Sequence, residues 1–230
     1  MQLQICIYLL IIQNLWTFFG NNWENHAEKI KEDWIKKVKK DDTVLIPGDF
    51  SWETYLKETY KDFEFLNSLP GKKILLRGNH DYWWSTVTSI KRFLKENNFN
   101  TIDLLYNNSI EVEDVVIAGT RGWDYNKSSD IKIIEREIHR LELSLESTKL
   151  LNTNKPIIVC MHYPPISNQY INNEFEKKII NLLNEYNVKL CLYGHLHGNS
   201  HAGAIIGKRD DIEYKLVSAD YLGFKLLKIM

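Results

Sequence analysis

Four short polar motifs, each placed directly after an apolar run, constrain the fold of this chain more than any other feature. The apolar runs have the length and composition of buried β-strands, and helical patterns separate them along the chain. Strands that alternate with helices predict an α/β fold, in which functional groups gather where strands end. The motifs are Gly48-Asp49, Gly78-Asn79-His80-Asp81, His162 before Tyr163-Pro164-Pro165, and Gly194-His195-Leu196-His197.

Hydrophobic periodicity gives the elements between these motifs. It predicts helices over residues 24–40, 54–69, 84–96, 129–151 and 174–186. It predicts strands over residues 43–46, 73–76, 102–105, 109–113, 115–118, 156–161 and 189–193, with short strands after Gly198. Residues 102–118 read as a strand cluster with hairpin pairing. No linker or internal repeat divides the sequence, so we expect a single domain over residues 1–230.

The amino-acid composition narrows the classes of function that this chain can have. The formal net charge is −1 over 230 residues, so there is no basic field for polyanion capture, and nucleic acid is disfavoured as a partner. The three cysteines form an odd set, and two lie in apolar strand-like runs, which favours reduced thiols and a cytoplasmic location. The apolar stretch 5–12 lacks a preceding Lys or Arg and is too short to span a bilayer, so neither export nor a membrane partner is expected.

The first two motifs supply oxygen donors and an imidazole. Gly48 allows a sharp turn that presents the carboxylate of Asp49, whose two oxygens can bridge two cations. Asn79 offers a neutral amide oxygen, and His80 beside Asp81 is an arrangement that can orient a proton donor. A turn or an N-cap explains each of these motifs equally well when it is taken alone.

The last two motifs supply imidazoles. Pro164 prevents the strand from continuing and fixes the loop that carries His162, although a lone histidine there is also a common core residue. In an extended segment His195 and His197 would point the same way and could serve adjacent ions. No thiolate accompanies these donors, which suits divalent ions that hold a phosphoryl group.

For several other polar and aromatic residues, a structural role is as plausible as a functional role or more so. His26 and His139 are expected on helix surfaces and His201 in a loop. Arg121 can bind a substrate phosphate or form a structural salt bridge. Trp83 and Trp84 can line a cleft, although packing in the core is the commoner role.

In this order the motifs resemble the signature of the calcineurin-like metallophosphoesterases, which is D-x-H, G-D, G-N-H-[DE], a lone His and G-H-x-H. The resemblance implies a four-layered α/β/β/α sandwich of two mixed sheets flanked by helices. It further implies that Asp49 bridges two divalent ions (Mn, Fe or Zn), that Asn79, His162 and His195 complete one site, and that His197 belongs to the other. His80, paired with Asp81, would protonate the leaving group of a phosphorylated small-molecule or protein substrate.

The first motif of that signature, D-x-H, is absent, because no Asp precedes Asp33. One permitted back-translation of residues 1–19 encodes Asp-Leu-His in another reading frame, and removal of one T from its final run of Ts rejoins the frame at Gly20. We therefore hypothesise that residues 1–19 arise from a frameshift and are not the family's own N-terminus. Codons for residues 4–7 that cannot spell GAT-TTG-CAT out of frame would refute this.

Two functions from different classes follow from these observations. The first is a phosphoesterase in which two metal ions activate a water, with activity reduced because one metal site lacks its D-x-H ligands. The second is a catalytically impaired phosphoesterase fold that binds a phosphorylated ligand or a protein. In both cases we expect the fold to be retained, with the apolar residues 5–12 filling the vacated slot of a buried strand.

Overall fold

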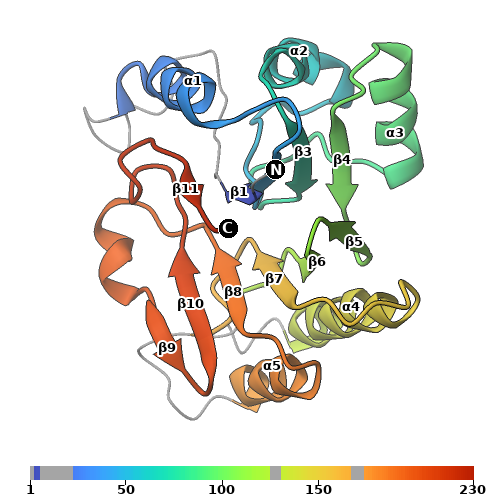
Figure 1. Cartoon of the computed structure of the whole chain (residues 1–230), viewed down its shortest axis with the longest axis vertical. Coiled ribbons are helices and arrows are strands. Elements are labelled where there is room, and N and C mark those ends of the chain that lie inside the picture. The colour runs from blue at the N-terminus through green and yellow to red at the C-terminus, as the bar shows by residue number, and fades with distance from the viewer. Residues whose placement is uncertain (1–2, 6–22, 125–130, 167–173) are drawn as a thin grey trace. The chain divides into compact units, whose positions relative to one another are not determined.

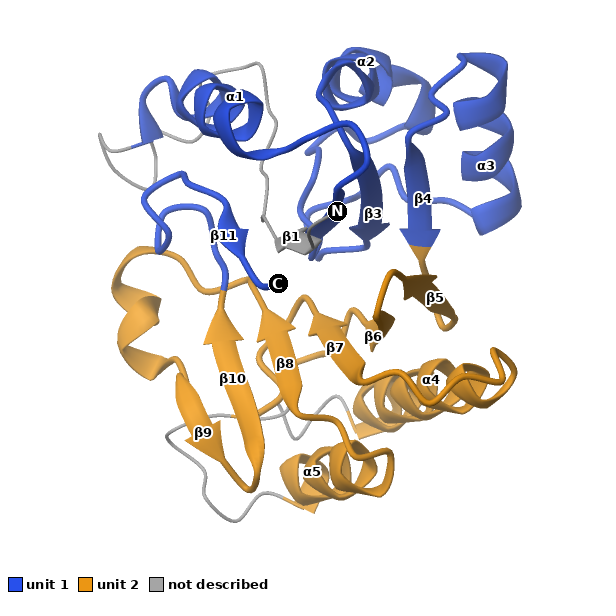
Figure 2. Cartoon of the chain, viewed as in Figure 1, with its two compact units in different colours: residues 1–104, 217–230 blue, residues 105–216 orange. Residues whose placement is uncertain are grey.

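The computed structural model describes residues 3–5, 23–124, 131–166 and 174–230. Within it the chain forms two compact units, shown in Figure 2. Unit 1 comprises residues 1–104 and 217–230, and unit 2 comprises residues 105–216. Each unit contains one β-sheet with its own helices.

Unit 1 contains a five-stranded sheet with the strand order β11-β1-β2-β3-β4. Figure 1 labels β11, β1, β3 and β4 of this sheet. Strands β1, β2 and β3 run parallel, whereas β11 is antiparallel to β1. The strands are β1 (Leu3–Ile5), β2 (Thr43–Ile46), β3 (Lys72–Leu76), β4 (Ile102–Leu105) and β11 (Leu227–Lys228). The helices are α1 (His26–Lys37), the 3-10 helix η3 (Leu56–Thr59), α2 (Tyr60–Ser68) and α3 (Val87–Glu96).

The core of unit 1 is rich in aromatic side chains. Phe63 on α2 lies 4.8 Å from Phe50 and 5.3 Å from Trp83, measured between ring centroids. All three rings are almost fully buried, as is Trp84. Such edge-on and tilted aromatic pairs add to the free energy gained from burial. Trp83 and Trp84 therefore pack in the core, as the commoner of the two interpretations predicted.

Unit 2 contains a six-stranded sheet with the strand order β5-β6-β7-β8-β10-β9. Strands β6, β7, β8 and β10 are parallel, and the two outer strands are antiparallel to their neighbours. The strands are β5 (Ser109–Val112), β6 (Val115–Thr120), β7 (Ile157–Met161), β8 (Leu190–Tyr193), β9 (Gly207–Arg209) and β10 (Ile212–Leu216). The helices are α4 (Ile131–Lys149), α5 (Glu174–Glu185) and the 3-10 helix η5 (Gly198–Gly203).

The long helix α4 packs against β5, β6 and α5. Its apolar stripe includes the buried residues Ile134, Leu141 and Leu145, which join the core of unit 2 with residues of β7, β8 and β10. Ile131, the first residue of the predicted stripe, is 47% exposed because the packed face begins one turn later. The amphipathic pattern thus predicted the buried face of this helix correctly from Ile134 onward.

The predicted fold class is confirmed, since the structure is a mixed α/β fold with two sheets flanked by helices. Two local predictions were wrong. The segment 54–69 begins with a turn of 3-10 helix before α2. Strand β4 pairs in the sheet of unit 1, whereas β5 and β6 form the predicted hairpin in unit 2. The single-domain assignment stays a prediction.

The structure tests only parts of the predictions about the N-terminus, the cysteines and membranes. The strand beside β2 is Leu3–Ile5, which shares only Ile5 with the segment 5–12 predicted to fill this slot, and residues 6–12, including Cys6, lie outside the described residues. Cys160 and Cys191 are buried free thiols. In the part of the chain that the structure describes, no helix combines the length and hydropathy needed to cross a lipid bilayer.

Candidate functional site

In unit 1 the motifs after β2 and β3 form two loops that touch. Gly48 has φ +97° and Asp49 has φ +56°, so the chain turns sharply after the strand. A Cβ atom on Gly48 would lie 2.5 Å from the backbone nitrogen of Gly78, and one on Gly78 would lie 2.0 Å from Asp49 Oδ1. Glycine at both positions therefore lets the loops approach closely. The carboxylate of Asp49, only 2% exposed as a residue, accepts a hydrogen bond of 2.8 Å from the His80 backbone.

The buried carboxylate of Asp81 organises both loops. It accepts hydrogen bonds from the consecutive backbone amides of residues 49, 50 and 51 at 2.8 to 3.1 Å, from the Gly78 amide at 2.6 Å and from the Trp83 indole at 3.1 Å. In the described residues no hydrogen bond joins this carboxylate to the His80 ring. The hypothesis that Asp81 pairs with His80 is therefore wrong, because backbone donors occupy the carboxylate.

Two carboxyl groups near these loops have raised pKa values. Burial and the neighbouring Asp49 carboxylate raise the pKa of Asp81, and the amide hydrogen bonds oppose this shift. Asp62 on α2 accepts a hydrogen bond from the Ser51 hydroxyl, and burial raises its pKa to about 7. The sequence analysis did not identify Asp62, because no pattern in the sequence shows that this residue of α2 faces the Asp49 loop.

The ring of His80 has aromatic neighbours. Its Nδ1 lies 3.0 Å from the Tyr82 hydroxyl, and its face stacks on Trp52 with the centroids 4.5 Å apart at an interplanar angle of 25°. Asn79, the neutral oxygen donor of the same motif, lies half-buried beside it. The structure thus brings Asp49, Asn79, His80 and Asp81 together at the ends of β2 and β3.

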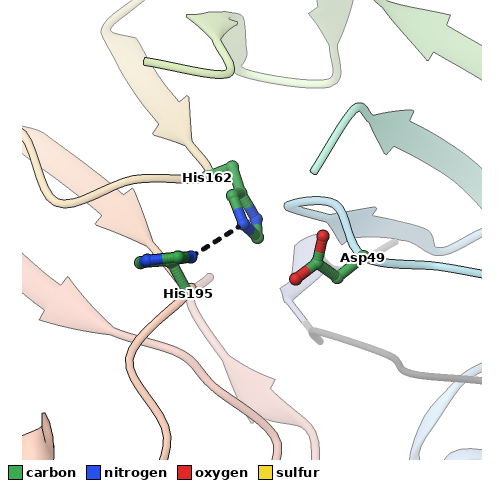
Figure 3. Close-up of side chains that lie close together, drawn as sticks. All are labelled: Asp49, His162 and His195. Atoms are coloured by element: carbon green, nitrogen blue, oxygen red, sulfur yellow. Dashed lines mark hydrogen bonds between the residues drawn. The ribbon is translucent and has the colours of Figure 1, made fainter. Parts of the chain in front are cut away.

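In unit 2 the motifs after β7 and β8 place two imidazoles side by side. His162 is 1% exposed, and its Nε2 lies 3.2 Å from His195 Nδ1 (Figure 3). The Gly194 amide donates to the His162 carbonyl at 3.1 Å, which holds the two loops together. The Tyr163 ring covers His195 with the centroids 4.1 Å apart. His162 and His195 therefore lie together at these two strand ends, and their assignment as metal ligands stays a prediction.

The segment after β8 differs from the predicted extended form. His195 has φ +69°, and the Leu196 amide donates to the Gly194 carbonyl at 2.8 Å, so the chain makes a γ-turn centred on His195. His197 itself is extended and caps η5, where its amide donates to the Ser200 hydroxyl. The argument that alternation orients His195 and His197 alike was therefore wrong, because the turn breaks the alternation. Backbone strain of this kind is common where a fold fixes functional side chains.

The spacing of the two imidazoles fits a shared metal ion. Two nitrogens that bind one ion at about 2.1 Å with tetrahedral or octahedral angles stand about 3.0 to 3.4 Å apart. The 3.2 Å between His162 Nε2 and His195 Nδ1 falls in that range. Imidazole nitrogens are also donors that suit divalent transition metals. The two imidazoles therefore fit a metal ion.

Arg121, at the end of β6, belongs to an ion-pair cluster within unit 2. It lies 3.7 Å from the carboxylate of Glu137 and stacks over Trp123 at 4.7 Å. Glu137 on α4 is fully buried and also binds Arg140 at 2.6 Å. The structural salt bridge predicted for Arg121 is confirmed, whereas contact with a phosphate stays a prediction. Glu137 was missed because it resembles an ordinary surface acid of a polar helix.

The remaining histidines have structural surroundings. His26 is buried, not on the helix surface as expected, because its Nδ1 binds the Trp23 carbonyl at 2.8 Å. His139 is exposed on α4 and lies 3.1 Å from Glu142. His201 lies in the 3-10 helix η5, where a loop was expected.

Comparison with known families identifies the chain. The model of the calcineurin-like phosphoesterases matches residues 18–199, most of the chain. The chain belongs to the calcineurin-like phosphoesterase family. This match spans both units and covers all four motifs that the sequence contains. The family resemblance expected from the motifs is thereby confirmed.

Solved structures share the fold of this calcineurin-like phosphoesterase at low sequence identity. A protein of unknown function, AQ665 from Aquifex aeolicus, is 17% identical with a TM-score of 0.53, covering 99% of this chain and 95% of that one. The phosphopantetheinyl hydrolase PptH from Mycobacterium tuberculosis is 14% identical with a TM-score of 0.55, covering 100% and 95%. GAP50, the anchor in the inner membrane complex of Plasmodium, is 13% identical with a TM-score of 0.58, covering 95% and 71%. No curated protein sequence matches the chain.

Proposed function

We propose that this chain is a metal-dependent phosphoesterase in which Asp49, His162 and His195 hold a divalent metal ion. The observation that carries the proposal is the pair of imidazole nitrogens 3.2 Å apart in unit 2. The buried Asp49 carboxylate of unit 1 is the further ligand that the family signature assigns to this ion. Membership of the calcineurin-like phosphoesterases supports phosphoester hydrolysis in general.

The family signature assigns the remaining roles in this proposal. Asn79 adds an amide oxygen to the site of Asp49, His162 and His195, and His197 belongs with Asp49 to a second ion. Divalent ions (Mn, Fe or Zn) bound there would polarise the phosphoryl group and lower the pKa of a bound water. His80 donates a proton to the leaving oxygen, which needs only an imidazole N–H within hydrogen-bond reach of that oxygen.

Asp81 acts on this site through the backbone. Its hydrogen bonds to the amides of residues 49 and 78 hold the Asp49 loop against the His80 motif. Arg121, held by Glu137 and stacked on Trp123, offers a planar cation suited to a phosphate or carboxylate anion. The substrate in this proposal is a phosphorylated small molecule or protein.

A catalytically impaired binding module is the second candidate, and one observation favours it. The strand position beside β2 is filled by Leu3–Ile5, in a segment that lacks the D-x-H ligands of the family signature. Such a chain would still bind a phosphorylated ligand through the remaining metal ligands and Arg121. Turnover separates the two candidates.

Hydrolysis of bis(p-nitrophenyl) phosphate with Mn²⁺ tests the proposal. We expect slow turnover by the chain, a loss of at least about 100-fold in His195→Ala, and no change in the control His139→Ala. A version with Asp-Leu-His restored in the N-terminal segment should turn over faster. Equal rates for His195→Ala and the unchanged chain would contradict the proposed enzyme. Equal rates with and without the restored segment would refute the idea of an incomplete second metal site.

A further inference from the structure

Tyr82 lies in an unusual position for an exposed aromatic residue. It is 58% exposed, yet its hydroxyl lies 3.0 Å from His80 Nδ1 and its ring meets the His80 ring edge-on at 5.8 Å. Its backbone amide donates to the His80 carbonyl at 2.8 Å, so a tight turn through Asp81 brings the two side chains together. Burial does not explain this placement, because most of the Tyr82 side chain remains in solvent.

Trp52 fixes the same imidazole from another direction. Its ring stacks on the face of His80 at 4.5 Å, and it follows Ser51 in the loop that Asp81 holds through backbone amides. The imidazole is therefore held on its face by an indole and at Nδ1 by a hydroxyl. Of its two ring nitrogens, Nε2 is the one that these contacts leave for a substrate.

The Tyr82 hydroxyl can accept a hydrogen bond from an imidazole N–H at Nδ1. With Nδ1 held by this hydroxyl and the ring face held by Trp52, the direction in which Nε2 points is fixed.

We propose that Tyr82 is a positioning residue that orients His80, through its hydroxyl, for proton donation to the leaving group. This inference rests on the proposed phosphoesterase function. In the step, the N–H bond at His80 Nε2 breaks, its electron pair stays on the nitrogen, and an O–H bond forms on the departing alkoxide or phenoxide. Tyr82 itself neither gains nor loses a proton.

Leaving-group dependence tests the role in catalysis. Protonation matters most for basic leaving groups, so Tyr82→Phe should lower kcat about fivefold or more for phenyl phosphate esters of basic phenols, by loss of one orienting hydrogen bond. The effect should fade for p-nitrophenyl esters, and KM should change little for either class. The matched control is Tyr55→Phe, which removes a hydroxyl from another exposed tyrosine of unit 1. A uniform loss across all leaving groups, or none, would overturn the proposal.

Nuclear magnetic resonance of the imidazole nitrogens gives a readout that does not require turnover. With ¹⁵N-histidine label, Tyr82→Phe should shift the His80 Nδ1 resonance and change the balance of tautomers, whereas Tyr55→Phe should not. An unchanged Nδ1 signal would overturn the positioning role even in an active chain. An inactive chain that shows the shift would contradict the proposed hydrolysis and retain the Tyr82–His80 contact, so the two failures are distinguishable.

Discussion

Asp81 shows how one buried carboxylate can hold two loops. Five N–H donors converge on its oxygens, four from the backbone and one from the Trp83 indole. We expect Asp81→Asn to lower the free energy of unfolding by at least about 2 kcal/mol, because an amide NH₂ would face donors that need an acceptor. Urea denaturation measures this, with the exposed Asp114→Asn as control. Stability equal to that of the unchanged chain would show that the loops do not depend on the carboxylate.

A second prediction concerns Lys73 and the pH dependence of the free energy of unfolding. Its ammonium group is fully buried on β3 and binds the Leu69 carbonyl and the Thr101 hydroxyl, and burial lowers its pKa from 10.5 to about 8. Between those values the unfolded chain holds the Lys73 proton and the folded chain does not, so Lys73 by itself makes the free energy of unfolding rise with pH. The buried thiols of Cys160 and Cys191, whose pKa values are raised by burial, act in the opposite direction over the same pH range.

The contribution of Lys73 is measurable by urea denaturation between about pH 8 and pH 9.5, as a difference in slope between two variants. The free energy of unfolding should fall more steeply with pH, or rise less, in Lys73→Met than in Lys72→Met, the exposed neighbour on the same strand. A slope that is the same in both variants would assign the effect to other groups.

At the scale of elements, the contact between β6 and β7 depends on Gly119. A Cβ atom there would lie 1.8 Å from the backbone oxygen of Cys160 on the paired strand. We expect Gly119→Ala to lower the free energy of unfolding by about 1 to 3 kcal/mol, because two buried backbones must separate. Gly203→Ala is the control, since no atom lies within 4 Å of its added Cβ. Equal thermal stability of the two variants would contradict this tight pairing.

Hydrophobic patterns in the sequence predicted the positions of helices and strands better than the pairing between strands. The strands that precede Asp49, His80, His162 and His195 were found because their apolar runs are short and end at Gly or Pro. The placement of β4 was missed, because sheet membership depends on long-range pairing that a local pattern does not encode. The γ-turn at His195 was missed because non-glycine residues adopt positive φ only where tertiary contacts compensate the strain.

The roles of single side chains were only partly predictable, because a local sequence pattern shows which residues follow a strand but not which residues they contact. Donor type and position after a strand pointed to Asp49, His162 and His195. The partners of Asp81, Asp62 and Glu137 depend on which loops and helices face them, and spacing along the chain does not carry this information. The pairing of His80 with Tyr82 likewise became visible only from the turn geometry.

At the scale of the whole molecule, the family match and the N-terminal segment lead to different expectations about activity. Residues 18–199 match the calcineurin-like phosphoesterases, and the sheet of unit 1 forms with Leu3–Ile5 beside β2. The fold is therefore retained without the D-x-H ligands. In the proposed mechanism, binding of one metal ion would need only the residues that remain, whereas efficient hydrolysis would need the second site as well. Metal affinity is thus a more direct test of the account than turnover.

The decisive measurement is the equilibrium binding of Mn²⁺ and Zn²⁺ to the full chain and to His162→Ala, with His139→Ala as the matched surface control. We predict that the chain and the control bind at least one ion with the same affinity. His162→Ala should bind it at least about 10-fold more weakly, since one of two adjacent imidazole ligands is gone. Equal affinity in His162→Ala, or no binding by the unchanged chain, would contradict the metal site on which the proposed function rests.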